Sequence, residues 1–339
     1  MDKSDYASVE VSKDKLLVLV KRDEKTLREK VFPNTRSGHR AIARHLGDRP
    51  ARVIMEATGI YYLDLAIFLS AQEGIEVMIL NPQVSRHYAI ATLKRAKNDS
   101  VDAKVLLDYV MTRPFVPFNP PSEVAYKLRA ISRKIRSIIW NCSRMRSQLH
   151  AETSTKETPK AVIKASERSI RNDEKTIKML MEEALKLVAG DPGLKREFEI
   201  VDSVPGFADG GSVQILGELK TLPAHLSTRQ VVAFAGLDPV EHKSGSSVDK
   251  KKGISKRGSK YLRIALYMAA LTAVRYNPHV KAFHEHLIAK GKAPIVALIA
   301  VCRKLLHSIW GMLKNNETFD GNKFYKLPKQ EPSFVVSAS

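Results

Sequence analysis

Cysteines, long apolar runs and acidic residues are all scarce in this sequence. Its two cysteines, Cys142 and Cys302, lie in apolar helical stretches and lack the spacing of a zinc site or a disulfide framework. We expect them to be small core residues in a reducing compartment. No stretch approaches the roughly 18 uninterrupted apolar residues of a membrane span, and the segment MDKSDYASVEVSK has no apolar run typical of a signal peptide. These absences predict a cytoplasmic protein with no membrane partner.

The shortage of acidic residues leaves a large positive charge. The 339 residues include 56 lysines and arginines but 36 aspartates and glutamates, a formal net charge of +20. Such an excess costs free energy through self-repulsion unless a polyanion neutralises it. Nucleic acid is the commonest polyanion, because each neutralised phosphate releases condensed counterions; a merely basic soluble protein is the alternative. The hydrophobic fraction of 44% predicts a folded chain, and the length suits two or three domains.

Residues 1–113 are predicted to form one α/β domain. Alternating apolar residues predict strands, and apolar spacings of three or four predict helices. In chain order we expect strands 7–11, 16–20 and 30–33, a helix from Ser37 to Leu46, strand 53–55, helix 61–72, strand 76–80, a helix from Pro82, and helix 101–111. Three hairpin strands followed by β-α-β-α is the order of a ribonuclease H-like fold.

Residues 114–193 are predicted to be a proline linker followed by a basic helical arm. From Lys127 to Arg146 there are seven basic and no acidic residues. A helix that is apolar on one side and cationic on the other suits a phosphate backbone, although a solvated helix face gives the same pattern. The apolar spacing over 170–187 predicts a helical hairpin or a coiled-coil dimer contact. The residues expected to bind nucleic acid here are Lys127, Arg129, Arg133, Lys134 and Arg136.

Residues 194–326 are predicted to form a mostly α-helical domain, with a polar tail at 327–339. The turn Val204-Pro-Gly-Phe207 lies between apolar helices. It resembles the turn of a helix-hairpin-helix, whose backbone N–H groups bind a phosphate. An ordinary interhelical loop would have the same sequence.

Four acidic residues of the first domain form a candidate metal site. Glu10 lies in the first strand, Glu56 follows the 53–55 strand, and Asp99 and Asp102 begin a helix on one face. In a ribonuclease H-like fold these elements meet at one edge of the sheet. Converging carboxylates repel one another, and a divalent cation, Mg²⁺ or Mn²⁺, removes that repulsion. Separately, Asp99 could be an N-cap and Asp102 a partner of the helix dipole.

A glycine-containing basic loop in the third domain is a second candidate site. Between Glu241 and Arg263 there are eight lysines or arginines and two acidic residues. We expect a mobile loop that approaches phosphates closely. One serine, such as Ser244, could be a nucleophile on phosphorus, or the serines could only bind phosphate. The cations expected to bind nucleic acid are Lys250, Lys251, Lys252, Lys256, Arg257 and Lys260.

Several segments, in order, resemble the DEDD insertion-sequence transposases that use a bridge RNA. They are Glu56-Ala-Thr-Gly59, Asn81-Pro82, Asp99-Ser-Val-Asp-Ala103, Ala235-Gly-Leu237, Ser244-Gly-Ser-Ser247 and Arg263-Ile-Ala-Leu-Tyr-Met268. The resemblance runs from about Tyr6 to Phe319 and is very specific. It implies a RuvC-like N-terminal domain with an acidic tetrad, a helical arm that mediates dimer contacts, and a C-terminal transposase domain.

The resemblance also implies a reaction and partners. Ser244 would attack DNA, with Mg²⁺ held by Glu10, Glu56, Asp99 and Asp102. A structured noncoding RNA, the bridge RNA, would pair with donor and target DNA, as in other RNA-guided systems. A homodimer or homotetramer working at the bacterial nucleoid would be expected, because strand exchange needs two duplexes.

Residue 10 departs from the family pattern, which has aspartate in the first strand. Glu10 reaches one methylene further, and a shift near 1 Å can cost about 100-fold in a positioned reaction. Two alternatives stay open, and Glu10 bears on the second of them. One is a metal-dependent DNA junction nuclease, in which Ser244 only contacts phosphate. The other is an inactive relative that binds nucleic acid.

Overall fold

The first strands form because apolar residues alternate along them. A computed structural model describes residues 5–23, 25–92, 98–244 and 248–327. In β1 (Asp5–Val11), Ala7, Val9 and Val11 share one face and are buried. The other strands are β2 (Lys15–Arg22), β3 (Lys25–Thr26), β4 (Lys30–Pro33), β5 (Ala51–Glu56) and β6 (Ile75–Leu80). Their order is β3-β2-β1-β5-β6, with β4 paired to β2.

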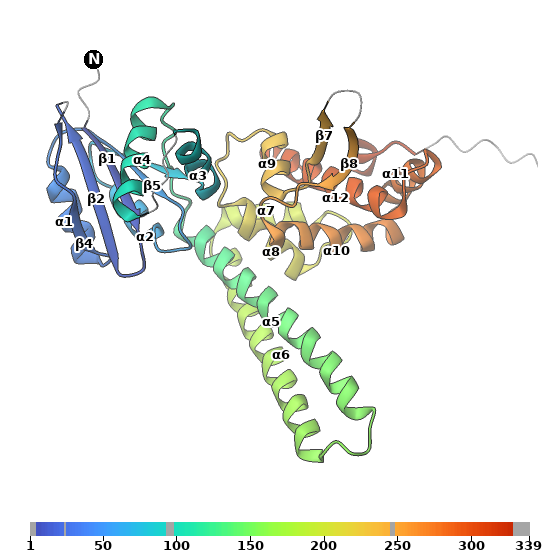
Figure 1. Cartoon of the computed structure of the whole chain (residues 1–339). Coiled ribbons are helices and arrows are strands. Elements are labelled where there is room, and N and C mark those ends of the chain that lie inside the picture. The colour runs from blue at the N-terminus through green and yellow to red at the C-terminus, as the bar shows by residue number, and fades with distance from the viewer. Residues whose placement is uncertain (1–4, 24, 93–97, 245–247, 328–339) are drawn as a thin grey trace, which may run out of the picture. The chain divides into compact units, whose positions relative to one another are not determined.

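This sheet is mixed, as the predicted ribonuclease H-like order requires. Strands β1 and β2 are antiparallel, as are β2 and β4, whereas β5 is parallel to both β1 and β6 (Figure 1). Strand β3, which pairs with β2, was not expected from the sequence. The order of strands and helices agrees with the sequence-based prediction, because local apolar periodicity is enough to predict both kinds of element.

Helices cover both faces of the sheet. Ile42 of α1 (Arg36–Leu46) and Leu65 of α2 (Leu63–Ser70) pack in one core cluster with Val9 and Met55. On the other face, Leu106 of α4 (Asp99–Thr112) packs with residues of β2, β5 and β6. Helix α3 (Pro82–Ala91) packs against α4. The sheet is therefore the middle layer of three.

The N-caps of two helices in this unit differ from the start expected for α1 and from the N-cap alternative considered for Asp99. Helix α1 was expected to begin at Ser37, but Thr35 is its N-cap and accepts a hydrogen bond from the Gly38 amide at 3.3 Å. Helix α4 is capped by Asn98, whose Oδ1 accepts from the Val101 amide at 2.8 Å. Asp99 is therefore the first residue of α4 and not its N-cap, so its carboxylate is not used for capping.

The chain divides at Pro120 and Pro121 into two compact units. The second unit is built mainly of helices, namely α5 (Glu123–Thr153), α6 (Lys160–Ala189), α7 (Pro192–Asp202), α8 (Asp209–Leu219), α9 (Thr228–Ala235), α10 (Lys260–Tyr276), α11 (Pro278–Ala289), α12 (Pro294–Asn315) and α13 (Gly321–Phe324). Segment 114–121, predicted as a linker, has no helix or strand. Its Phe118 amide nevertheless donates to the Val77 carbonyl of the first unit at 2.6 Å.

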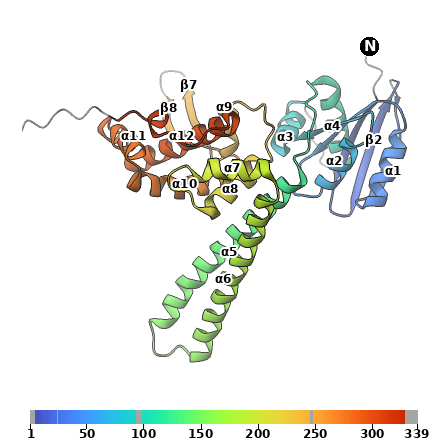
Figure 2. The ribbon, with the colours of Figure 1, turned by 180° about the vertical axis from the view of Figure 1, so that it is seen from behind.

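Helices α5 and α6 pack side by side as a long hairpin, which extends from the rest of the second unit (Figures 1 and 2). The polar interruption in the α6 apolar stripe, Asp173, has a partner inside this hairpin, because Asn141 Nδ2 donates to its carboxylate at 2.6 Å. Cys142 is buried beside it. The apolar stripe therefore packs within one chain.

Helices α8 and α12 form the centre of the second unit. Residues 212–219 of α8 are all buried. Helix α12 is long and apolar enough to cross a membrane, but its Val301, Leu305 and Ile309 are fully buried in the core. Cys302 lies beside them, and burial raises the pKa of its thiol to about 12. Both cysteines are core residues, as predicted.

The Val204–Phe207 turn joins α7 and α8 and packs against α10. Gly206 has a φ of +91°, and a Cβ there would lie 2.2 Å from the Ala269 carbonyl oxygen. Glycine is needed because two backbones approach each other closely. This geometry favours the interhelical-loop interpretation of the turn over the phosphate-binding one.

Candidate active site and nucleic-acid interface

Glu10 and Glu56 occupy equivalent positions on neighbouring parallel strands. The register pairs Val9 of β1 with Met55 of β5, so the next residue of each strand is one of the two glutamates. Because side chains alternate along a strand, both glutamates belong to the face that α4 covers. The parallel pairing of β1 and β5 thus places two of the predicted carboxylates side by side along the sheet.

The start of α4 brings a third carboxylate to Glu10. Ser8 Oγ donates to the Ala103 carbonyl at 2.7 Å, which ties the first turns of α4 to β1. Glu10 and Asp99 line one small pocket together with Lys15. The Lys15 ammonium lies 3.3 Å from Asp99 Oδ2, and both side chains are about 60% exposed. Asp102 follows one turn later and is half-buried.

Glu56 is held by hydroxyl groups rather than by another carboxylate. Ser85 Oγ of α3 donates a short hydrogen bond to one oxygen, and Thr58 Oγ1 donates to the other at 3.4 Å. Within the described ranges, no three acidic, histidine or cysteine side chains form a ready metal-binding group. The sheet and α4 therefore bring the predicted ligands to one face of the sheet without gathering three of them around one point.

The donors on this face nevertheless fit a hard divalent cation. They are carboxylate oxygens, the ligands that Mg²⁺ and Mn²⁺ prefer. A cation already compensates one of them, since Lys15 pairs with the exposed carboxylate of Asp99. Glu10, Glu56, Asp99 and Asp102 would hold the metal, which would polarise a phosphate oxygen.

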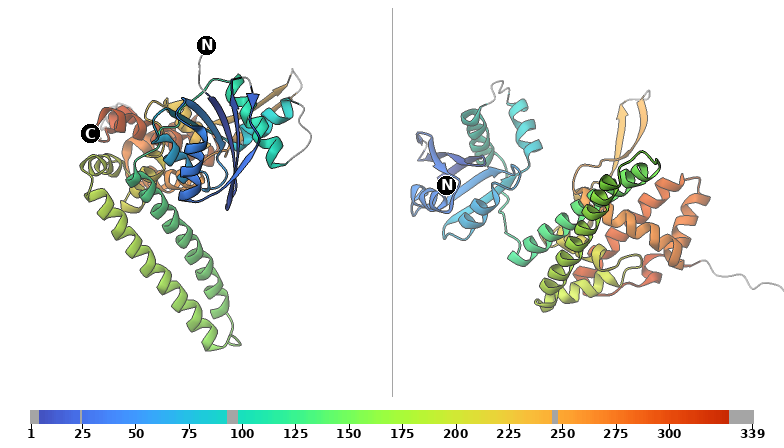
Figure 3. Two further views of the ribbon diagram at one scale, coloured as in Figure 1. Left: turned by 90° about the vertical axis from the view of Figure 1, so that its left-hand side faces the viewer. Right: turned by 90° about the horizontal axis from the view of Figure 1, so that it is seen from below.

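Ser244 lies in a β-hairpin of the second unit, where the sequence had predicted a mobile loop. It is the last residue of β7 (Pro239–Ser244) and pairs with Val248 of β8 (Val248–Ile254). Residues 245–247 lie outside the described residues. The two strands project from the helices around them (Figures 1 and 3). Lys250, Lys251 and Lys252 all belong to β8, so the basic run is part of a strand.

The base of this hairpin is fixed by close backbone packing. Gly236 ends α9 in the left-handed region with a φ of +63°, and a Cβ there would lie 2.6 Å from the Arg257 carbonyl oxygen. Ser255 Oγ donates to Asp238 Oδ1 at 2.6 Å, which bridges the two ends of the hairpin. The Arg263 guanidinium donates to the Ala235 carbonyl at 2.8 Å, and burial lowers the pKa of that guanidinium.

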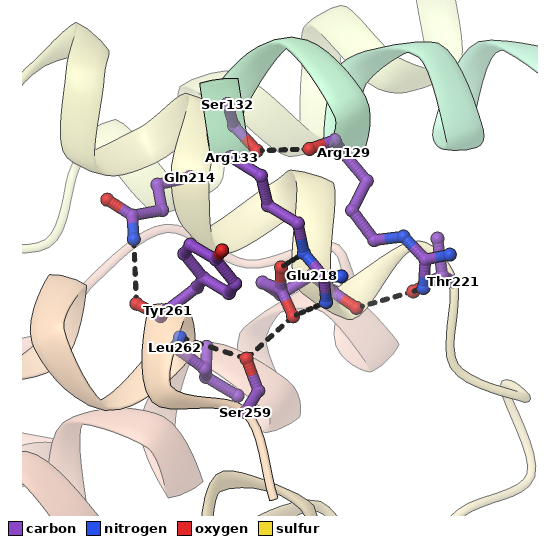
Figure 4. Close-up of polar contacts among 9 residues, drawn as sticks. All are labelled: Arg129, Ser132, Arg133, Gln214, Glu218, Thr221, Ser259, Tyr261 and Leu262. Carbon is purple, nitrogen blue, oxygen red and sulfur yellow. Dashed lines mark hydrogen bonds and ion pairs between the residues drawn. The ribbon is translucent and has the colours of Figure 1, made fainter. Parts of the chain in front are cut away.

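A buried carboxylate, Glu218 of α8, connects this base to the arm (Figure 4). Its side chain is 0% exposed. Arg133 of α5 donates to its two oxygens from Nε at 2.6 Å and Nη2 at 2.9 Å. Ser259, the N-cap of α10, donates to the same carboxylate at 2.7 Å. Sequence analysis did not identify Glu218 as important, because its partners are distant along the chain.

The arm's cations fall into paired and exposed groups. Arg133 is engaged by Glu218, Lys127 lies 2.6 Å from Glu123, and Arg129 donates to Thr221 at 3.1 Å. Lys134 is exposed. Arg136 is partly buried, and burial lowers the pKa of its guanidinium.

Exposed cations also surround the start of α10. Lys256, Arg257 and Lys260 are exposed and lie between the end of β8 and the first turn of α10. Lys256 itself adopts a left-handed conformation, with a φ of +54°. These cations are placed where a phosphate could reach them. Ser244 and these cations belong to the second unit, whereas the four acidic residues belong to the first.

Known families and proteins match both units. The family described as "Transposase IS116/IS110/IS902 family" matches residues 198–285, and the DEDD transposase family of IS110 type matches residues 9–152. The pilin gene-inverting protein of Moraxella bovis is 27% identical over 85% of this chain and 89% of its own length. Its counterpart in Moraxella lacunata is 28% identical over 82% and 84%. The transposase for insertion sequence element IS1111A of Coxiella burnetii is 28% identical over 41% and 38%.

The two matched ranges include the main candidate residues. All four acidic residues lie within 9–152, and Ser244 lies within 198–285. A DEDD domain implies a ribonuclease H-like fold and dependence on a divalent metal, in agreement with the mixed sheet of the first unit.

Proposed function

The chain belongs to the IS110-type family of DEDD transposases, and on that premise we propose that it cuts and rejoins DNA through a covalent link to Ser244. It is a DNA transposase, so its substrate is the DNA of an insertion element. The observation that carries the proposal is the place of Ser244 at the end of β7, on a hairpin whose base is fixed by backbone packing. A fixed base limits the positions that the hairpin, with Ser244 at its far end, can take.

In the proposed reaction the Ser244 hydroxyl attacks the scissile phosphorus. A serine–phosphate bond forms, the bond to one deoxyribose oxygen breaks, and the proton of the serine ends on a base or on the leaving oxygen. The phosphodiester energy is conserved, so a new deoxyribose hydroxyl can reverse the step and rejoin the strand. Lys256 and Arg257, which lie between β8 and α10, would bind the flanking phosphates.

The acidic residues of the first unit would hold Mg²⁺, or Mn²⁺ in its place. When bound, the metal would act as a Lewis acid that stabilises negative charge on a phosphate. Ser85 and Thr58 would keep the Glu56 carboxylate oriented through their hydrogen bonds. Lys15 would leave Asp99 as the metal arrives, because both side chains are exposed and the ion pair is weak.

The names of the relatives favour recombination over simple hydrolysis. Two of them are pilin gene-inverting proteins, and inversion of a DNA segment requires that its ends be rejoined. A junction nuclease that uses water would leave the ends free. For the choice of DNA sequence we propose a structured guide RNA that pairs with donor and target. For strand exchange we propose a homodimer or homotetramer, with contacts through the α5–α6 arm.

A covalent adduct tests the role of Ser244. Supercoiled donor DNA, Mg²⁺ and the guide RNA would be incubated with the protein and analysed on a denaturing gel. The parent should form a protein–DNA adduct, and Ser244→Ala should form none while binding RNA as the parent does. Ser246→Ala, a serine two residues away, is the matched control and should keep the adduct. Cleavage without an adduct, or an adduct with Ser244→Ala, would overturn the assignment.

Thermal stabilisation tests the metal site separately. At 100 times its dissociation constant, a metal that binds only the folded state stabilises by about 2.7 kcal/mol. Asp99→Asn should remove this stabilisation, because it removes a ligand charge. Asp108→Asn is the control on the same helix, since Asp108 accepts from the Tyr88 hydroxyl and lies outside the pocket. A melting temperature that ignores saturating Mg²⁺ and Mn²⁺ would contradict the proposed site.

A further inference from the structure

An exposed tryptophan lies in the middle of the basic helix α5. Trp140 is 43% exposed, whereas Trp310 is 6% exposed and donates its indole N–H to the Leu226 carbonyl at 3.0 Å. Burying an indole ring would stabilise the fold, so the exposure of Trp140 needs another reason. Aromatic rings interleaved with cations are typical of surfaces that bind single-stranded nucleic acid.

The surroundings of Trp140 have this composition. The Lys260 ammonium lies 4.8 Å from the Trp140 ring centroid and 5.3 Å from that of Tyr261. The Arg136 guanidinium lies 6.0 Å from the Trp140 centroid. We call Arg136, Trp140, Lys260 and Tyr261 the Trp140 platform. It joins the arm to the first turn of α10, next to the Glu218 network in which Arg133 and Tyr261 lie together (Figure 4).

Within the part of the chain that the structure describes, no carboxylate forms an ion pair with Arg136 or Lys260. No acidic residue occurs between Lys127 and Arg146, and Glu218 is buried beneath Arg133. Arg136 Nε is buried and has no hydrogen-bond acceptor among the residues that the structure describes. A buried N–H without an acceptor is costly, so the Arg136 side chain gains hydrogen bonds if its guanidinium turns outward to a phosphate oxygen. The platform therefore combines an open aromatic ring with cations that need an anion.

We propose that the Trp140 platform binds an unpaired nucleotide, whose base stacks on Trp140 while Arg136 and Lys260 bind its phosphate. Stacking of a base on an aromatic ring is stronger than an exposed cation–π contact, so Lys260 can leave the ring for the phosphate. A base inside a duplex presents no free face and is excluded. The inference rests on the proposed function, from which the nucleic-acid partner follows. It places an unpaired strand where the basic segment after β8 meets α10.

Binding of short oligonucleotides to the full-length protein tests the platform. The probes are a fluorescein-labelled 12-nucleotide DNA strand, the RNA strand of the same sequence, and the DNA duplex. Trp140→Ala should weaken binding of at least one single strand by about tenfold, which corresponds to the usual loss of one stacked base, and leave duplex binding unchanged. Trp140→Phe should restore most of the affinity. Preference for RNA or DNA would identify which strand uses the platform.

A second readout leaves Trp140 in place and follows its fluorescence. In a Trp310→Phe background, Trp140 is the only tryptophan, and stacking should quench its fluorescence when either strand is added. Tyr276→Ala is the matched control, because Tyr276 is 73% exposed and lies beside Arg275. It should change neither the affinity for the oligonucleotides nor the quenching of Trp140. The proposal is overturned if Trp140→Ala binds both single strands like the parent, if it weakens duplex binding equally, or if no quenching occurs. Such failures would leave covalent cleavage by Ser244 unaffected, because the adduct assay is independent.

Discussion

Removing Arg133 should destabilise the second unit more than removing both members of its ion pair. Glu218 is 0% exposed, and Arg133 makes a two-bond contact with it from a 37% exposed position. In Arg133→Ala the carboxylate stays buried with the Ser259 hydroxyl as its remaining hydrogen-bond partner in the network of Figure 4. Breaking a buried pair in this way typically costs 3–5 kcal/mol. Because water can reach the place of the guanidinium, we expect about 3 kcal/mol.

The double variant Arg133→Ala/Glu218→Gln separates this loss from simple loss of contacts. Glutamine keeps the size of Glu218 and a hydrogen bond with Ser259, but it carries no charge to leave unpaired. The double variant should therefore be more stable than Arg133→Ala alone. If the two changes were independent, their costs would add, and the double variant would be the less stable protein.

Calorimetry of the full-length protein is the appropriate assay, because two compact units can unfold in separate transitions. For a unit of this size, a loss of about 3 kcal/mol lowers the midpoint by roughly 6–12 °C. The transition of the first unit should not move. Lys134→Ala, an exposed neighbour on the same helix, should move neither transition. A double variant less stable than Arg133→Ala would refute the reasoning.

Three further predictions concern the metal face, the arm and a buried histidine. Glu10→Asp should raise the rate of single-turnover strand cleavage in Mg²⁺, because aspartate has the side-chain length of the family pattern. Glu10→Ala should abolish cleavage. Slower cleavage by Glu10→Asp than by the parent would show a pocket adapted to glutamate. Replacing Lys134 and Arg136 together by alanine should reduce the slope of log affinity against log salt by roughly 1.4–1.8 units, and an unchanged slope would mean that neither contacts phosphate. Burial lowers the pKa of His39 from 6.5, so the unfolded chain binds a proton more readily, and stability present above about pH 6.5 is lost as the pH falls. His39→Gln should flatten that loss in acid melting curves.

The sheet of the first unit could be predicted because its signals are local. Alternation of buried and exposed residues in β1 and β2 depends only on near neighbours. The same holds for the helices that end at glycine or begin at proline, such as α3. Once strand order was fixed, Glu10 and Glu56 had to fall on adjacent strands. How tightly the carboxylates gather could not be predicted, because it depends on the packing of α4 against the sheet.

The hairpin β7–β8 could not be predicted, for a physical reason. Three consecutive lysines and Gly253 hide any alternation in β8, so composition indicated a mobile loop. The strand pairing is instead fixed by contacts at its base, where Gly236 and Gly258 admit backbone atoms that a Cβ would exclude. Such contacts join residues about twenty positions apart, and sequence periodicity does not report them.

The arm shows why a count of charges overestimates a binding surface. The sequence presents Arg133 and Lys134 as equal cations, but Arg133 is neutralised by Glu218, which lies 85 residues away. Its charge therefore does little to attract phosphate, whereas the exposed charge of Lys134 is available. Arg136 differs from both, because its Nε is buried without an acceptor among the described residues. The affinity of the arm for nucleic acid should consequently depend on the few cations near Trp140 rather than on the whole basic stretch, and Arg133→Ala should change stability far more than salt dependence.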